Sequence, residues 1–175
     1  MTPFDDLVAR ATADPHVVGL ILIGSQARDM ATEHSDHDIL VIVESFTEAW
    51  AEPVDHSAAL DTIPYLREWL SDTSEKWSRW RFRGARVLLD RTEGQVLAGL
   101  CAAQATLTPA ETDEWSREYL DSYINQIYRA AKNHRDGRLT LARLELMESL
   151  AWFLDALFAL RDRVYRDYLR LPMAF

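Results

Sequence analysis

Residues 17–43 decide the fold of this chain, and they read VVGLILIGSQARDMATEHSDHDILVIV. Two apolar segments rich in β-branched residues, 17–23 and 36–43, predict two buried strands. The polar loop between them carries glycine, serine and two aspartates close to the strand ends. We therefore expect the chemistry of the protein where the first strand ends and the second begins.

Gly24 and Ser25 end the first strand, and a short helix is expected to begin at about Gln26. A strand that ends in Gly-Ser and opens a helix presents free backbone N–H groups, which suit an anion such as phosphate. Gly24 allows close approach of a ligand, and Ser25 adds a hydroxyl. Arg28 is a second candidate for a phosphate contact, or else an ordinary charge on the surface of a helix.

Asp36 and Asp38 are two residues apart at the start of the second strand. The two-residue period of a strand places both carboxylates on one face, about 6.5 Å apart. Two carboxylates beside a phosphate site are suited to holding Mg²⁺. His37, which lies between them, should point to the opposite side of the strand.

Outward from this stretch, the first half mixes helices with strands. Thr2-Pro3 predicts a helix that begins there and ends near Ala13. Further strands are expected at 58–63, bounded by Pro64, and at 80–89, where Gly84 is either a bulge or a turn. The class expected is α+β, with a mixed β-sheet flanked by helices in a domain of residues 1–95.

Residues 96–175 are expected to form a C-terminal helical bundle. Thr108-Pro109 begins a capping box, and a helix should follow until Asp136-Gly137. A second long helix should begin near Thr140, giving an antiparallel hairpin. The apolar residues expected to face the core of the two helices are Trp115, Tyr119, Tyr123, Ile127 and Ala131, then Leu144, Met147, Leu150, Ala151, Leu154 and Phe158.

Composition limits the partners of the chain. Its 175 residues hold 19 Lys and Arg against 28 Asp and Glu, a net charge of −9. An acidic chain is a poor general binder of nucleic acid, and it is compatible with a cationic small molecule. A single Cys101 excludes an internal disulfide, and no segment is typical of a membrane span or a signal peptide. We expect a cytoplasmic protein that binds no nucleic acid or membrane, and oligomerisation stays open.

The string from Gly24-Ser25 to Asp36-His37-Asp38 resembles the signature of the DNA polymerase β-like nucleotidyltransferase superfamily. The likeness is greatest to its bacterial aminoglycoside nucleotidyltransferase-like branch, in which such a domain precedes a helical bundle. The likeness continues at 86–91, 123–125 and 128–133, so it spans most of the chain.

The resemblance implies roles for residues of the first domain. Gly24 and Ser25 would contact a triphosphate, and Asp36 and Asp38 would be metal ligands. Family members bring a third carboxylate from a later strand. Asp61 is the candidate here, although it can also be an ordinary loop acid. Asp90 is the second choice, against its interpretation as a strand-end or turn residue.

The resemblance also implies roles in the helical domain. Lys132 would contact the triphosphate, or else be a solvated helical lysine. Glu145 and Glu148 lie close to the apolar face of the second long helix, and Glu148 is the better candidate for a general base. It can equally be a hydrogen-bond partner between helices. The ending at 172–175 indicates a shortened helical domain, since similar proteins tend to run further, and substrate contacts would be lost if they belong to the missing part.

The expected activity is transfer of a nucleoside monophosphate, AMP from ATP, to a hydroxyl of a small, aminoglycoside-like acceptor with two Mg²⁺ ions. The alternative is a non-catalytic, antitoxin-like protein that keeps the fold and acts by binding a partner. The third carboxylate separates the two, because two-metal catalysis is doubtful if neither Asp61 nor Asp90 reaches Asp36 and Asp38.

Overall fold

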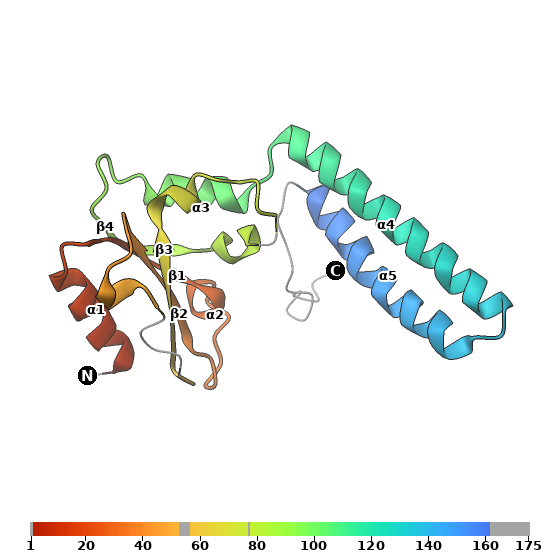
Figure 1. Cartoon of the computed structure of the whole chain (residues 1–175), viewed down its shortest axis with the longest axis horizontal. Coiled ribbons are helices and arrows are strands. Elements are labelled where there is room, and N and C mark those ends of the chain that lie inside the picture. Colours follow the sequence, from red (N-terminus) through yellow and green to blue (C-terminus); the bar gives the residue numbers. More distant parts are fainter. Residues whose placement is uncertain (1, 53–56, 77, 162–175) are drawn as a thin grey trace. The chain divides into compact units, whose positions relative to one another are not determined.

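The computed structural model describes residues 2–52, 57–76 and 78–161. The chain divides after Ala105 into two compact units. The first unit holds a four-stranded sheet with helices, and the second is helical (Figure 1). The α+β class expected from the sequence is confirmed. The elements of the first unit are α1 (Pro3–Ala13), β1 (Val17–Ile23), α2 (Gly24–Ala27), β2 (His37–Val43), η1 (Glu48–Trp50), β3 (Leu60–Leu66), η2 (Arg67–Leu70), η3 (Arg79–Phe82), β4 (Arg86–Asp90) and α3 (Leu97–Ala105).

The sheet has the strand order β3-β2-β1-β4. β1 is antiparallel to both β2 and β4, whereas β2 and β3 are parallel. β1 and β2 are the two inner strands, and most of their side chains are buried. This explains their almost continuous apolar sequences, because an inner strand with both faces covered has no solvent side. The predicted strands at 17–23 and 36–43 are confirmed.

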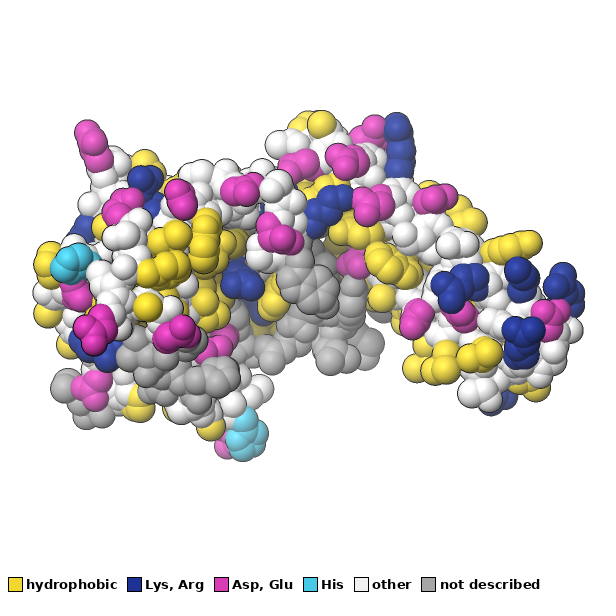
Figure 2. Space-filling view, in the orientation of Figure 1, with side chains coloured by type: hydrophobic (Ala, Val, Ile, Leu, Met, Phe, Trp, Pro, Cys, Tyr) yellow, Lys and Arg dark blue, Asp and Glu magenta, His cyan; other side chains and the backbone are white. Residues whose placement is uncertain are grey.

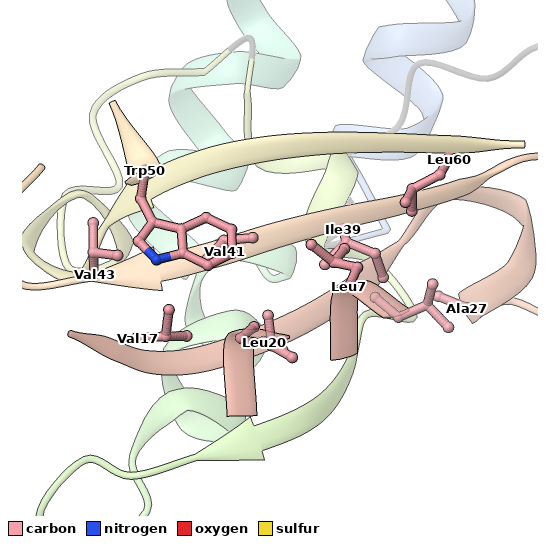
Figure 3. Packing of buried hydrophobic residues seen from close by; sticks show 11 residues of the cluster. Leu7, Val17, Leu20, Ala27, Ile39, Val41, Val43, Trp50 and Leu60 are labelled. Carbon is pink, nitrogen blue, oxygen red and sulfur yellow. The ribbon is translucent and has the colours of Figure 1, made fainter. Parts of the chain in front are cut away.

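Each face of the sheet carries its own apolar cluster. On one face, Leu7 and Ala11 of α1 and the indole of Trp50 belong to one buried cluster with residues of β1 and β2. Leu7 lies beside Ile39 in this cluster, and Trp50 lies beside Val41 (Figure 3). On the other face, α3 and the 3-10 helices η2 and η3 cover the alternate residues of the same strands. The capping box at Thr2 and the proline after it begin α1 as predicted.

Two predicted strands have different bounds in the structure. The strand expected at 58–63 continues through Pro64 to Leu66, which is possible because β3 is an edge strand. The strand expected at 80–89 is wrong in its first half. Residues 79–82 form η3, and Gly84 turns the chain with φ +73° before β4 begins at Arg86.

Helix α3 belongs to the first unit. Its Leu97 and Cys101 are buried in the cluster on one face of the sheet. Gln104 Nε2 donates hydrogen bonds to the carbonyls of Leu70, at 3.0 Å, and Asp72, at 2.8 Å. The division between units therefore lies after residue 105, whereas the predicted boundary lies after residue 95.

The second unit contains α4 (Pro109–Arg135) and α5 (Leu139–Ala159). The predicted capping box at Thr108 is present, with Thr108 N donating to Glu111 Oε2 at 2.8 Å. Gly137 ends α4 with φ +73°, as expected for a helix C-terminus. Within the described ranges, no helix combines the length and hydropathy that crossing a membrane requires. The chain end at 172–175 lies outside the described residues.

The two helices meet through smaller side chains than predicted. The buried residues of α5 are small: Ala142, Ser149, Ala156 and Ala159. Leu144, Met147 and Leu150, expected in the core, are exposed by 53–73%. On α4, Trp115 is buried, but Ala131 is exposed and Gln126 and Ala130 take interior positions. A helix that is apolar on several sides cannot reveal by its sequence which side a neighbour covers.

Candidate active site

The predicted site residues of the first unit gather at one edge of the sheet. In the antiparallel pair of β1 and β2, Ile23 lies opposite Asp38, so the end of β1 meets the start of β2. In the parallel pair of β2 and β3, Asp38 lies opposite Asp61. Partners in register share a face of the sheet. Gly24 of α2, Asp38 of β2 and Asp61 of β3 thus lie at the same end of the sheet.

The carboxylate of Asp38 lies against the backbone of Gly24. A Cβ built on Gly24 would lie 2.9 Å from Asp38 Cγ and closer still to Asp38 Oδ2. Gly24 also has φ +71°, a conformation that side-chain-bearing residues rarely adopt. Glycine is therefore required at this position for two reasons: the positive φ of the backbone, and the lack of space for a Cβ beside the carboxylate of Asp38.

Helix α2 is a single turn. It begins at Gly24, two residues before the expected start, and ends at Ala27, because Arg28 N and Met30 N both donate to the carbonyl of Ser25 and close the chain into a turn. Ile23 at its N-cap makes no side-chain capping hydrogen bond. The N–H groups of a first turn have no partner inside the helix. The candidate anion site therefore consists of these N–H groups and the buried Ser25, with little contribution from a helix dipole.

Asp36 lies one residue before β2 and two before Asp38. The loop that carries it is attached to α2, since Gln26 Nε2 donates to the carbonyl of Ser35 at 3.3 Å. His37 N donates to the carbonyl of Ala59 at 3.0 Å and extends the pairing of β2 toward β3. Gln26 thus joins the aspartate loop to α2, and in the sequence only its place directly after Gly-Ser pointed to it.

The carboxylates fit a hard divalent cation that also binds a phosphate. Asp36, Asp38 and Asp61 offer only oxygen donors, which Mg²⁺ prefers. Asp38 and Asp61 stand on neighbouring strands roughly 5 Å apart, where a cation would offset their mutual repulsion. In the described part of the chain, no three His, Cys, Asp or Glu side chains form a metal-binding group. One or two carboxylates with substrate phosphates and water nonetheless suffice for Mg²⁺.

Two arginines lie at the same edge of the sheet. Arg28 Nε donates to the carbonyl of Gly24 at 3.1 Å, and its side chain packs over Gly84, whose added Cβ would lie 2.7 Å from Arg28 Cγ. Arg86 pairs with Leu22 near the end of β1 and forms an ion pair with Asp29. Because Leu22 belongs to the cluster on the α1 face, Arg86 lies on the face of the sheet opposite to Asp38.

His37 lies on the opposite face of the sheet. Its ring stacks on Phe4 of α1, with the ring centroids 4.5 Å apart. Since adjacent residues of a strand alternate between faces, this contact places Asp38 on the face away from α1. The prediction that His37 points away from the aspartates is confirmed.

Asp90 is not at the site. It pairs with Gly19 near the start of β1, whereas Asp38 pairs at the end of that strand. Its carboxylate accepts hydrogen bonds from Thr92 N, at 2.9 Å, and Leu97 N, at 2.9 Å, so it joins the turn after β4 to the beginning of α3. The alternative third carboxylate is therefore wrong, and the strand-end role of Asp90 is confirmed.

Replacing Asp90 by Asn should lower stability in a pH-dependent way. Burial acts to raise the pKa of Asp90, but the hydrogen bonds from Thr92 and Leu97 outweigh it and lower the pKa below its ordinary value. A lowered folded-state pKa contributes stability above the unfolded pKa, and this is lost as pH falls through the folded pKa. We expect D90N to cost about 1 kcal/mol at pH 7 and progressively less below pH 4, by urea unfolding.

The matched control is D113N on the surface of α4. Asp113 forms an exposed i,i+4 ion pair with Arg117, of 2.8 Å. Its removal should cost at most about 0.5 kcal/mol. Equal losses for D90N and D113N at neutral pH would contradict the structural role of Asp90.

The candidate residues of the second unit have partners within the hairpin. Glu148 accepts a hydrogen bond from Gln126, which is the interhelical role considered for it. Glu145 is the more buried of the two acids and pairs with Arg129 at 2.8 Å, while its Oε2 is buried without a hydrogen-bond partner. Lys132 is exposed, with its Nζ 5.7 Å from the centre of the Tyr128 ring. A triphosphate contact by Lys132 and a base role for Glu148 stay predictions.

Comparison with known proteins agrees with the arrangement of the first unit. The family model of the nucleotidyltransferase domain matches residues 7–127, more than two thirds of the chain. The matched region runs from α1 into α4 and contains Gly24, Asp38 and Asp61. Comparison with curated proteins gives no match. Because the family match covers most of the sheet unit and the site at its edge, the chain belongs to the nucleotidyltransferase domain family.

Proposed function

We propose that this nucleotidyltransferase transfers AMP from ATP to a hydroxyl of a small cationic acceptor of the aminoglycoside kind. In this reaction the acceptor oxygen forms a bond to the α-phosphorus of ATP. The bond from that phosphorus to its bridging oxygen breaks, and pyrophosphate leaves with the electron pair. The observation that carries the proposal is the contact of the Asp38 carboxylate with Gly24, beside Asp61 in register.

The turn at Gly24 and Ser25 binds the triphosphate in this proposal. Backbone N–H groups of the first turn of α2 donate to phosphate oxygens, and the Ser25 hydroxyl adds a donor. Glycine at position 24 allows the phosphate to approach the backbone. Arg28, oriented by its hydrogen bond to the Gly24 carbonyl, presents positive charge beside this turn.

Asp36, Asp38 and Asp61 are the residues that would hold two Mg²⁺ ions. Bound there, the ions would lower the pKa of the acceptor hydroxyl and stabilise the charge of the leaving pyrophosphate. Asp38 occupies the central position, since it lies against Gly24 and opposite Asp61. Gln26 positions Asp36 by attaching the preceding loop to α2.

Glu148 receives the proton of the acceptor hydroxyl in this proposal, and Lys132 contacts the triphosphate. Gln126 donates to Oε2 of Glu148, so Oε1 is the oxygen available to accept the proton. The hydrogen bond also restricts the rotamers of Glu148, which a general base needs for a defined geometry.

The charge of the chain supports a cationic acceptor. The net charge is −9, and an acidic surface raises the local concentration of a polycationic amine. The same charge disfavours a nucleic-acid acceptor, whose phosphates it would repel.

The test is transfer of label from ATP that is radiolabelled at the α-phosphate to a panel of aminoglycosides, with Mg²⁺ or with EDTA. Labelled product and released pyrophosphate are expected only with Mg²⁺. D61N should reduce the rate by about 10- to 100-fold, since it removes one of three carboxylates, whereas D90N should leave the rate unchanged. If ATP with Mg²⁺ neither stabilises the chain thermally nor transfers label to any acceptor, the proposal fails.

A further inference from the structure

Helix α5 and its C-cap residue expose a row of large apolar side chains that Arg143 interrupts once. The row repeats with alternating steps of four and three residues, preceded by one step of seven. This spacing is the seam of a helix that packs against another helix. All members are exposed by 38–62%. They are Leu139, Leu146, Leu150, Phe153, Leu157 and Leu160.

Helix α4 adds further exposed apolar side chains beside this row. Leu120 and Ile124 are exposed by 47% and 56% and lie one turn apart. Tyr123, three residues after Leu120 and therefore next to it on the helix surface, contacts Phe153 of the α5 row with ring centroids 5.3 Å apart. The rows of the two helices are therefore on one side of the hairpin. We call them together the hairpin apolar surface.

A surface of this kind is unusual on an isolated domain. Eight large apolar side chains, about half exposed, exceed the few hundred Å² of contiguous apolar surface that monomers tolerate. The α4–α5 contact itself buries mainly small residues of α5. The largest apolar side chains of α5 thus stay exposed and are available to contact a partner. Figure 2 shows hydrophobic side chains at the surface of the hairpin.

The charges of the hairpin are separated along its length. The half near the turn, residues 123–148, holds five Lys and Arg against three Asp and Glu, a net charge of +2. The other half, residues 109–122 with 149–161, holds two Arg against six Asp and Glu, a net charge of −4. Figure 2 shows the basic side chains gathered near the turn.

We infer that the hairpin apolar surface binds the same surface of a second copy of this chain, with the two hairpins antiparallel. A two-fold axis across the hairpin places the basic turn of one copy beside the acidic end of the other, at both ends of the interface. A parallel pair would place like charges together. The product is a four-helix arrangement with the leucine rows at its centre. This inference does not depend on the reaction proposed above.

The first test measures the mass of the full chain by sedimentation equilibrium at several concentrations. The wild type should be a dimer. Leu150→Glu with Leu157→Glu should raise the dissociation constant at least about 10²-fold, because each dimer would bury four unpaired carboxylates.

The matched control changes the other side of the same helix. Leu141 and Leu144, exposed by 47% and 53%, lie away from the row by helical spacing. Leu141→Glu with Leu144→Glu should alter the dissociation constant by no more than about twofold. A monomer at all concentrations, or equal effects of both double variants, would overturn the inference. The first of these outcomes would mean that another part of the chain or a different protein covers the surface.

The second test determines the orientation of the two copies. Leu150 lies at the middle of the row and should meet its own copy, so Leu150→Cys should form an intermolecular disulfide on mild oxidation. Leu160 lies at one end, and an antiparallel pair separates the two copies of it by about 30 Å, so Leu160→Cys should stay reduced. Cross-linking of Leu160→Cys alone would show a parallel pair and refute the arrangement. Native Cys101 is buried, and burial raises its pKa to about 11, so its thiol does not compete.

Discussion

Asp38→Asn is expected to reduce nucleotidyl transfer by at least about 10²-fold while the chain remains folded. The carboxylate lies against Gly24, and Asp38 is in register with Asp61 on the neighbouring strand, so Asp38 connects the turn at Gly24 with the second predicted metal ligand. Asparagine keeps its size and removes the negative charge that a divalent cation requires. The loss should be at least comparable to that for a single hydrogen-bond donor at a reacting centre, roughly 10²- to 10³-fold. The measurement is kcat/KM for transfer, with thermal unfolding to verify the fold.

The control for this variant is the next residue along the strand. His37 stacks on Phe4 on the other face of the sheet. His37→Gln should therefore change transfer by less than about threefold, although it removes a ring contact of about 1 kcal/mol. If H37Q and D38N lost transfer equally, the activity would respond to the stability of this strand and the metal-holding role of Asp38 would be refuted.

Gly24→Ala should lower both stability and transfer. Alanine at φ +71° costs about 1–2 kcal/mol, and its Cβ would displace the carboxylate of Asp38. We expect a total loss of about 2–3 kcal/mol in the free energy of unfolding and at least a 10²-fold loss of transfer, as for D38N. Urea unfolding and the transfer assay measure the two effects separately.

Two other glycines serve as controls that distinguish the backbone cost of Gly24→Ala from the effect of displacing Asp38. Gly137 has almost the same φ, +73°, with nothing within 4 Å of an added Cβ, so Gly137→Ala should show the backbone cost alone and retain transfer. Gly99 lies within α3, also with open space, and Gly99→Ala should stabilise the chain by about 0.5–1 kcal/mol. Transfer by G24A at the level of G137A would show that the Gly24–Asp38 contact does not matter for function.

Structural features that depend only on residues close together in the sequence were predictable from the sequence. The apolar runs of β1 and β2, the capping boxes at Thr2 and Thr108, and the helix end at Gly137 follow from local chemistry. The opposite directions of His37 and Asp38 follow from strand alternation. The prediction of one strand over 80–89 was wrong in its first half. The residues there favour a strand locally, but in the structure they form the 3-10 helix η3, and the turn at Gly84 separates it from β4.

The sequence by itself determined which residue types stand at the ends of β1 and β2, since a two-residue period and a strand-to-helix turn are properties of a short segment. Only the tertiary structure decided which later acid joins them. Parallel pairing of β3 with β2 brings Asp61 beside Asp38, and antiparallel pairing of β4 with β1 carries Asp90 to the far end of the sheet. Similarly, packing of α5 on α4 through small residues decided which leucines remain exposed. Strand order, strand direction and the packed face of a helix are set by contacts between distant segments, and no local pattern encodes them.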